Sequence, residues 1–431
     1  MLIFLYLQKK KNTNWKKKRM LQRILVLNAG SSSLKYALYT ALDKQIQAVS
    51  ASGIIEQIGQ PNQKIKHKFQ VGDTKEKINL PFSEKDLNYN GALKSCLNLL
   101  RETVPHDDGG HFIHGVGHRV VHGGETLSRP EIVNTSVIEA IKKASSLAPL
   151  HNPANLQGIE TAMESLPTDC KHVAVFDTAF HSTLAPHVYH YAIPMEYYHN
   201  HGIRKYGFHG TSHEYILEES AKFLNKRVDT MNMISCHLGA GASVCCIKNG
   251  KSIDVSMGLT PMEGLVMATR SGDIDPSAIF HMMRELGMSK DEVEELIIKK
   301  SGWYGLSGEI DAREIERRAD NGEDQFELTQ KIMVHRIRKY IGAYMINLCG
   351  KMDALVFTAG LGENWPSLRE LCLHNMERFG MELDKEKNKN MILPDRCNDV
   401  STFFSQIRIF VIPTDEEKQI ARQTVQLINQ D

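Results

Sequence analysis

Apolar and polar positions alternate in the manner of β-strands near the start of the chain. Residues 23–28 and 33–40 form two apolar runs joined by a short glycine-serine turn. Strand-like alternation continues through residues 64–71 and 75–82. A period of two is typical of half-buried strands. The pattern therefore predicts a β-meander that opens the fold.

Helical periodicity follows this meander. It appears in residues 91–104 and in residues 136–150, where apolar positions recur every three or four residues. Apolar segments that resemble strands lie at residues 114–124 and 171–180. Strands followed by alternating helices and strands indicate a mixed sheet with helices on its faces.

The same order of elements returns in the second half of the chain. Residues 233–258 predict a strand, a small-residue turn and two further strands, with the dipeptide Asn-Gly at 249–250 as a hairpin signal. Helical segments at residues 276–287 and 325–350 precede an apolar strand and glycine turn at residues 354–360. We therefore expect an α/β protein of two similar domains with a ligand cleft between them.

Composition narrows the class of protein. Of the 431 residues, 42% are hydrophobic and 24% are charged, which is typical of a soluble globular chain, and no apolar run is long enough to span a bilayer. Residues 1–20 hold seven Lys and Arg and no acid, so the rest carries a net charge of about −6 against +1 for the whole. An acidic body argues against nucleic acid as the partner. Neither a nucleic acid nor a membrane is expected as a partner.

The cysteines and the N-terminal segment bear on the compartment. The eight cysteines include no CxxC pair, which favours reduced thiols and a cytoplasmic protein. Residues 1–20 place their charges after the apolar stretch, unlike a secretory signal. We expect a loose extension there, with organelle targeting as the minor alternative.

Three glycine-rich turns are candidates for holding phosphate. They lie at residues 30–33, 239–243 and 358–364, each next to a predicted strand. Backbone amides in such turns approach anions closely, although a single glycine-serine turn is equally consistent with an ordinary hairpin. Dinucleotide and P-loop motifs fail, because Val244 and Cys245 occupy positions where those motifs need glycine.

Isolated charged residues in glycine-rich stretches are candidates for binding ligands or for catalysis. Arg119 and Arg270 each have few other cations nearby, which suits a planar fork aimed at phosphoryl or carboxylate oxygens. Taken singly, each arginine is more often part of a structural ion pair. Asp177 ends an apolar strand, where a carboxylate holds Mg²⁺ or orients a reacting group.

Two HxxxH pairs, beginning at His118 and at His209, have the spacing of a zinc pair on a helix. The first falls on a predicted strand, where the two side chains would be about 13 Å apart. Thr211 and Glu214 match a capping box, which predicts a helix that starts after His209. A hydrogen-bond donor to phosphate is therefore the favoured role for His209, with zinc as the weaker alternative.

Nine motifs in order resemble those of the acetate kinase family. They are VLNAGSSSLKY, GHRVVHGGE, LAPLHNP, FDTAFH, YGFHGTSH, CHLGAGASV, MEGLVMATRSGDIDP, FTAGLGEN and PTDEEKQIAR. The resemblance implies the fold shared by acetate and sugar kinases, Hsp70 and actin, with two duplicated domains closing on ATP. It also implies reversible, Mg²⁺-dependent transfer of phosphoryl from ATP to acetate, giving acetyl phosphate and ADP, by a homodimer.

The resemblance further assigns a catalytic group and an acetate pocket. Its catalytic residues are Arg119, Asp177, His209 and Arg270. Its acetate pocket consists of Val121, Leu150, Phe208 and Pro261, with Arg119 on the carboxylate.

The resemblance assigns the remaining site residues to ATP and to a metal ion. Phosphate contacts are expected from Ser31, Ser33, Lys35, His237, Gly239 and Gly241. The adenosine side is expected to include Asp311, Arg313, Gly360, Gly362 and Asn364. Mg²⁺, with Mn²⁺ as an alternative, is expected at Asn28 and Glu416.

The implied domain division places residues 21–177 in the N-terminal domain, joined by a C-terminal helix at 417–431, and residues 178–416 in the C-terminal domain. The chain departs from the family pattern in three places. Ala240 and Asp415 each replace a common asparagine, and the loop at 308–311 is one residue shorter. These departures concern the phosphoryl donor, so pyrophosphate and GTP belong beside ATP in any assay.

Two other functions compete with this one. The first is a related acyl kinase acting on propionate or butyrate. The second is a non-catalytic ATP-binding protein that uses the same cleft as a conformational switch. The pair Arg119 and Arg270, with Asp177 and His209, favours an enzyme, because a binding module needs no clamp on the acid.

Overall fold

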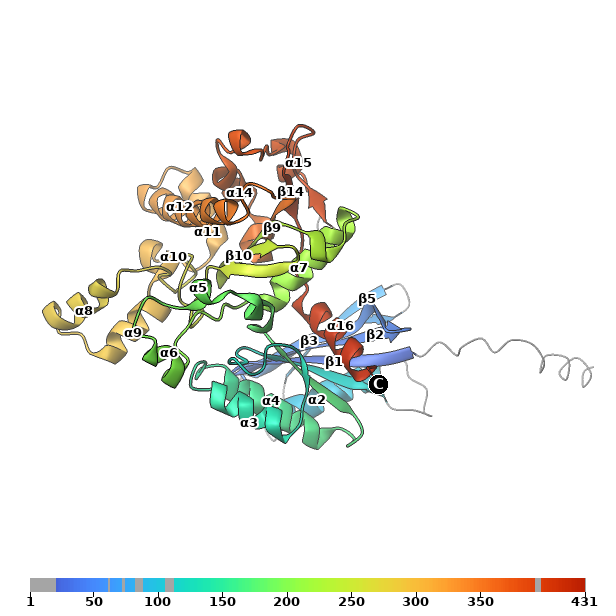
Figure 1. Ribbon diagram of the computed structural model, residues 1–431. Helices are drawn as coiled ribbons and strands as arrows, with labels where there is room; N and C mark the ends of the chain where they lie inside the picture. Colours follow the sequence, from blue (N-terminus) through green and yellow to red (C-terminus); the bar gives the residue numbers. More distant parts are fainter. Residues whose placement is uncertain are drawn as a thin grey trace, which may run out of the picture.

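A computed structural model describes residues 21–60, 63–71, 74–81, 88–104, 112–391 and 397–430. The 1–20 extension therefore lies outside the described residues. Two mixed sheets flanked by helices make up the molecule (Figure 1).

The first sheet has the strand order β5-β4-β3-β2-β1-β6-β8-β7. Strands β1 to β5 form the expected antiparallel meander, and β6 and β8 add to it in parallel. The strands are β1 (Leu21–Ala29), β2 (Ser33–Leu42), β3 (Gln45–Glu56), β4 (Lys64–Val71), β5 (Thr74–Pro81), β6 (Gly115–Val120), β7 (Glu131–Ile132) and β8 (Lys171–Phe176).

The second sheet has the strand order β11-β10-β9-β12-β14-β13. Its strands are β9 (Met233–Leu238), β10 (Ala242–Lys248), β11 (Lys251–Val255), β12 (Ala354–Thr358), β13 (Asn398–Asp399) and β14 (Arg408–Val411). A meander of three strands followed by two parallel strands is common to both sheets. The duplicated α/β fold expected from the sequence is confirmed.

Fifteen α-helices are described in these residues. They are α2 (Tyr89–Thr103), α3 (Thr135–Ala144), α4 (Asn152–Ser165), α5 (Pro186–Tyr189), α6 (Glu196–His201), α7 (Gly210–Phe223), α8 (Pro276–Glu285), α9 (Lys290–Lys299), α10 (Gly302–Ser307), α11 (Ala312–Asp320), α12 (Asp324–Asn347), α13 (Ala359–Asn364), α14 (Pro366–Leu373), α15 (Lys385–Lys389) and α16 (Glu416–Ile428). No helix among the described residues is long and apolar enough to cross a membrane.

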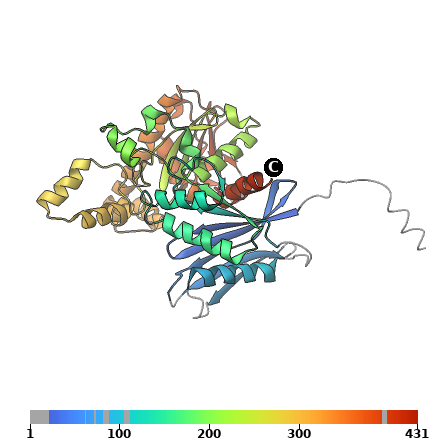
Figure 2. The same ribbon diagram turned by 60° about the horizontal axis from the view of Figure 1, so that its bottom comes forward.

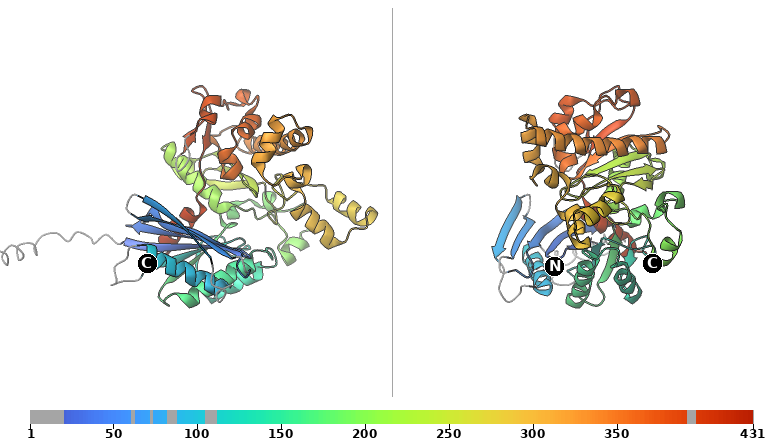
Figure 3. Two further views of the ribbon diagram at one scale, coloured as in Figure 1. Left: turned by 180° about the vertical axis from the view of Figure 1, so that it is seen from behind. Right: turned by 90° about the vertical axis from the view of Figure 1, so that its left-hand side faces the viewer.

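Helices pack on both faces of each sheet. Along β1, Leu25 and Leu27 pack with α2, whereas Ile24 and Val26 pack with the C-terminal helix α16, as period-two alternation requires. Figure 2 shows α2 beneath the blue strands of this sheet, and Figure 3 shows the C-terminal end of α16 beside them. The second sheet lies between α7 on one face and α12 with α14 on the other.

Two details of the predicted helices are wrong. Helix α3 ends at Ala144 rather than near residue 150, because the hydroxyls of Ser145 and Ser146 bond the last helical carbonyls. The capping box is absent at α7, which begins at Gly210 with His209 as its N-cap, so that Thr211 lies inside the helix. The Thr211 hydroxyl instead bonds Asp177.

Candidate active site

An ion pair between half-buried Arg119 and buried Asp177 joins the ends of two parallel strands. Arg119 lies in β6 and Asp177 follows β8, the neighbouring strand. Arg119 Nη2 is 2.7 Å from Asp177 Oδ2, and Arg119 Nε is 3.1 Å from both carboxylate oxygens. Burial raises the pKa of Asp177, and the fork of Arg119 opposes that rise.

The N-terminus of α16 brings a second carboxylate to Arg119. Arg119 Nη1 lies 3.6 Å from Glu416 Oε2. Burial alone would raise the pKa of Glu416, but the charges of Arg119, His237 and Lys35 lower it below its ordinary value. Asp415 caps α16 through the amide of Lys418.

The first turn of α7 is fixed to the end of β8. Gly210 donates its amide to the Asp177 carbonyl at 2.8 Å, and a Cβ on Gly210 would lie 2.3 Å from that oxygen. His209 precedes it with a φ of 57°, a left-handed conformation that is uncommon outside glycine. The strained backbone directs the His209 side chain toward the second sheet, where it contacts Ser243 of β10.

Two histidine rings stack at the meeting point of the sheets. The centroids of His209 and His237 are 4.1 Å apart with an interplanar angle of 25°. His209 Nδ1 lies 2.9 Å from Ser243 Oγ, and His237 Nδ1 lies 2.8 Å from Ser212 Oγ. Burial holds the pKa of His209 well below 6.5 and lowers that of His237 to about 4, so both rings are neutral at pH 7.

Arg270 is held in a different way. Its Nη1 donates to the Pro261 carbonyl at 2.9 Å, and no carboxylate among the described residues pairs with it. Burial lowers the pKa of Arg270. After burial and neighbouring histidines, the charges of both Arg119 and Arg270 lower the pKa of His209, and both also lower that of His151. The two guanidinium groups therefore act on the same small region.

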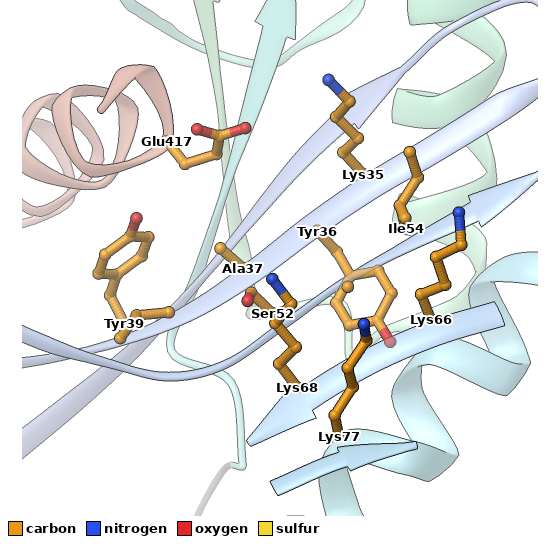
Figure 4. A pocket seen from close by; sticks show the side chains of 12 residues that line it. Lys35, Tyr36, Ala37, Tyr39, Ser52, Ile54, Lys66, Lys68, Lys77 and Glu417 are labelled. Carbon is orange, nitrogen blue, oxygen red and sulfur yellow. The ribbon is translucent and has the colours of Figure 1, made fainter. Parts of the chain in front are cut away.

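The first glycine-serine turn joins β1 to β2 beside this region. Asn28 and Lys35 face each other in register across these strands, and Ser31 and Ser33 lie in and just after the turn. Lys35 is exposed and contributes to the lowered pKa of Glu416. Figure 4 shows Lys35 at one wall of a hollow of about 450 Å³ and Glu417 at another.

The second glycine turn lies against the histidines and Arg270. Gly239 donates its amide to the Gly241 carbonyl at 3.1 Å. A Cβ on Gly241 would be 3.4 Å from His209 Nε2 and 3.6 Å from Arg270 Nη1, and a Cβ on Gly239 would be 3.7 Å from His237 Nε2. The exposed Ala240 lies between these glycines.

The residues expected around the acetate methyl differ in burial. Phe208 is fully buried, and half-buried Val121 packs against the hydrophobic cluster that contains it. Pro261 is half-buried and bonds Arg270 through its carbonyl. Leu150 is 61% exposed. It precedes His151, whose pKa is lowered by burial and by the charges of Arg270 and Arg119. Leu150 is therefore the most exposed of the four residues.

The residues expected near adenosine lie in two segments. Asp311 caps α11 and pairs with the exposed Arg313 at 2.6 Å. Gly360, Gly362 and Asn364 lie in α13, directly after β12. A Cβ on Gly360 would meet open space, so this helix has an uncrowded surface there.

The oxygen donors fit a Mg²⁺ ion bound largely through phosphate. Glu416 and Asp177 lie on either side of Arg119, and Asn28 pairs in register with Lys35 beside them. No cluster of three potential metal-binding side chains occurs among the described residues. Mg²⁺ commonly uses one or two carboxylates plus substrate phosphates, whereas zinc would need a fuller protein cage.

Several polar contacts at the site were not predicted from the sequence. Ser212, Ser243 and Thr414 bond the histidines or each other, and Glu363 accepts hydrogen bonds from the amides of Ala359 and Thr414. Serines in apolar strands carry no local signal of such a role. Glu363 belongs to the third glycine turn, which the sequence pattern did indicate. Its partner Thr414, however, lies 51 residues away in the chain.

The duplicated fold and a site of two arginines, neutral histidines and glycine turns define a phosphoryl-transfer enzyme of the two-sheet α/β class. The family model for the acetokinase family matches residues 23–422, and the chain belongs to that family.

Similar proteins agree with this family over almost the whole chain. An acetate kinase of Thermotoga maritima is 46% identical over 410 residues, covering 94% of this chain and 98% of the relative. Among solved structures, an acetate kinase of Porphyromonas gingivalis has a TM-score of 0.86 at 39% identity, covering 95% of this chain and 100% of that one. A propionate kinase of Francisella tularensis subsp. tularensis has a TM-score of 0.82 at 39% identity, with coverages of 94% and 99%.

Proposed function

We propose that this chain catalyses the reversible, in-line transfer of the γ-phosphoryl group of ATP to acetate, giving acetyl phosphate and ADP. The observation that carries the proposal is that His209 Nε2 and Arg270 Nη1 border the same space at Gly241. Arg119 lies next to it, because its partner Asp177 accepts the amide of Gly210, the residue after His209. Two guanidinium groups, one from β6 and one from the segment between β11 and α8, suit a phosphoryl group passing between two anions. The Thermotoga maritima and Porphyromonas gingivalis relatives are named acetate kinases, which supports the same reaction here.

Acetate is ionised at neutral pH, so the nucleophile needs no general base. The reaction needs alignment and relief of repulsion between a carboxylate and a polyphosphate. Arg270, which has no carboxylate partner among the described residues, is available to an incoming anion. Arg119 is fixed by Asp177 and Glu416, so its orientation is set before substrate arrives.

We assign the remaining groups to the donor side. Ser31, Ser33 and Lys35 face the phosphates with the glycine turn at 239–241, and α13 with Asp311 and Arg313 lies on the adenosine side. Glu416 and Asn28 would hold Mg²⁺, or Mn²⁺, which supplies charge neutralisation on the phosphate oxygens when bound. Neutral His209 and His237 offer ring nitrogens as uncharged hydrogen-bonding groups.

Detection of acetyl phosphate as its hydroxamate, with ATP, Mg²⁺ and acetate, tests the proposal directly. We expect turnover with ATP, and runs with pyrophosphate and GTP address Ala240. Formation of no acetyl hydroxamate by a folded protein that binds ATP would favour the non-catalytic switch instead. A phosphoenzyme that survives isolation would contradict direct transfer.

The exposure of Leu150, one of the residues proposed to surround the acetate methyl, leaves room for propionate as a second substrate. An extra methylene changes discrimination by about 1–3 kcal/mol. We expect Val121→Ala to lower the KM for propionate relative to that for acetate, because Val121 packs against the hydrophobic cluster that contains Phe208 and its truncation enlarges the proposed pocket. Steady-state kinetics with acetate, propionate and butyrate measure the ratio. The same ratio in wild type and variant would remove Val121 from the pocket.

We also propose the larger organisation of the enzyme. The packing of α16 on β1 supports a first domain of residues 21–177 plus 417–431 and a second of residues 178–416. Helix α8 has no buried residue but carries exposed Phe280 and Met283, which supports a homodimer formed through this helix. All eight cysteines are unpaired, which supports a reducing, cytoplasmic location.

A further inference from the structure

A buried chain of hydrogen bonds reaches the His209 ring at Nδ1, the nitrogen that does not face Gly241. Ser235 Oγ lies 3.0 Å from His213 Nδ1, His213 Nε2 lies 2.9 Å from Ser243 Oγ, and Ser243 Oγ lies 2.9 Å from His209 Nδ1. Ser235, His213 and Ser243 are completely buried. Water therefore cannot substitute for any partner within the chain.

The direction of this chain follows from counting protons. Each serine hydroxyl has one proton, and a neutral imidazole has one donor nitrogen and one acceptor nitrogen. If Ser235 donates to His213 Nδ1, then His213 donates to Ser243 and Ser243 donates to His209 Nδ1. Every buried group in the chain is then satisfied, and the proton of His209 lies on Nε2.

The opposite direction leaves a buried donor without an acceptor. His209 would donate through Nδ1, and His213 would donate to Ser235. Among the described residues Ser235 Oγ has no hydrogen-bond partner besides His213, so its own proton would be unpaired. An unsatisfied buried donor costs about 1–3 kcal/mol, which favours the first direction by about 5- to 150-fold.

The free nitrogen of His209 faces the second glycine turn. A Cβ on Gly241 would lie 3.4 Å from His209 Nε2 and 3.6 Å from Arg270 Nη1, so these two atoms border the same space. A proton on Nε2 would attract a phosphoryl oxygen there, whereas a lone pair would repel it. The catalytic role of this Nε2 proton rests on the proposed function.

We propose that Ser243, which contacts His209 directly, and Ser235, which acts through His213, are positioning residues that hold His209 as its Nε2–H tautomer. Burial keeps the pKa of His213 well below 6.5, in agreement with a neutral ring within the chain.

Nitrogen NMR of the unliganded full-length enzyme, labelled with ¹⁵N at histidine, tests the proposal without any substrate. We expect wild type to show one His209 tautomer with the proton on Nε2. Ser243→Ala and Ser235→Ala should each give a mixture of both tautomers. In kinetics, Ser243→Ala should lower kcat by about 2- to 10-fold, in proportion to the fraction of His209 that loses the Nε2 proton, with little change in the KM for ATP. Ser235→Ala acts one step further away and should have a smaller effect in the same direction.

Ser220→Ala is the matched control. Ser220 is another completely buried serine, and its hydroxyl bonds only the Ile216 carbonyl within α7. It should lose a similar amount of stability without changing the His209 tautomer or kcat. If Ser243→Ala does not fold, Ser235→Ala still tests whether the hydrogen-bond chain sets the His209 tautomer, because it leaves Ser243 in place.

The outcomes separate this inference from the proposed function. A proton on Nδ1 in wild type, or an unchanged tautomer in both serine variants, would overturn the positioning role. The expected NMR result in a protein that makes no acetyl phosphate would leave the positioning role intact and reject the kinase assignment. Recovery of the pure tautomer in Ser243→Thr, which keeps the hydroxyl, would support it further.

Discussion

Arg119 and Arg270 are held in the site by different contacts. Arg119 bonds Asp177 at 2.7 Å, and Asp177 is 2% exposed. Loss of the arginine therefore leaves a buried carboxylate without its cationic partner. Arg270 bonds a backbone carbonyl, and no carboxylate among the described residues depends on it. The two side chains therefore differ in structural importance while sharing a proposed catalytic role.

Alanine substitution should separate these two roles. Both Arg119→Ala and Arg270→Ala should lower kcat by about 10³–10⁵-fold, as for other arginines in phosphoryl transfer. Only Arg119→Ala should also lower the free energy of unfolding by about 3 kcal/mol, because it breaks a buried pair. Urea unfolding beside the hydroxamate assay measures both effects. Equal stability losses in the two variants would contradict the distinction drawn between the arginines.

Helices α7 and α16 are joined by a carboxylate that prefers to be protonated. Burial, and then the charge of Glu218, raises the pKa of Glu214 to about 7. Gln423 of α16 donates to Glu214, while its own Oε1 is buried without a partner. The unfolded chain binds fewer protons than the folded one between about pH 4.5 and pH 7, so stability falls as pH rises through that range.

Glu214→Gln should remove this pH dependence. A glutamine amide supplies Gln423 Oε1 with a permanent donor, so the variant should be more stable than wild type at pH 8 by about 1–3 kcal/mol. Thermal unfolding between pH 4.5 and pH 8 measures the difference. Glu218→Gln is the comparison, since Glu218 bonds Arg422 and should lose stability instead. Parallel pH curves for wild type and Glu214→Gln would refute the assignment.

The open face of the β-meander places like charges opposite each other. Lys68 of β4 and Lys77 of β5 are direct cross-strand neighbours, and Figure 4 shows both in the hollow beside Lys35. Like charges in this position are destabilising. Lys77→Glu should raise the free energy of unfolding by about 0.2–1 kcal/mol at low salt, and Lys77→Gln by less. Urea unfolding with and without added salt measures the gain, and a gain that salt does not reduce would exclude a charge effect.

At the scale of the whole molecule, α8 and α9 project from the body (Figure 1, Figure 3). Phe280 is 54% exposed and Leu286, which caps α8, is 66% exposed. Phe280→Glu with Leu286→Glu should therefore convert the proposed dimer to a monomer without unfolding it. Light scattering after gel filtration measures the mass, with the exposed pair Lys142→Glu and Lys143→Glu on α3 as the control. A wild-type protein that is already monomeric would reject this interface.

The sequence predicted repeating local patterns well and long-range contacts poorly. Asn249 and Gly250 have the positive φ values of the expected hairpin turn, 50° and 72°, because their preference is local. The pairing of Arg119 with Glu416 joins residues far apart in the chain, and no sequence pattern predicted it. The family resemblance assigned both residues to one site, but it did not pair them. Ser235 and Ser243 lie in apolar strands, where nothing local distinguishes a functional hydroxyl from an ordinary buried one.

The return of α16 to the first sheet has a consequence for synthesis on the ribosome. Ile420 and Val425 complete the apolar layer over Ile24 and Val26, nearly the full chain length away. The second sheet is built from a continuous stretch of chain, so it has all its strands before the first sheet is covered. A nascent chain must therefore keep the earliest translated strands exposed on one face until its last helix has emerged.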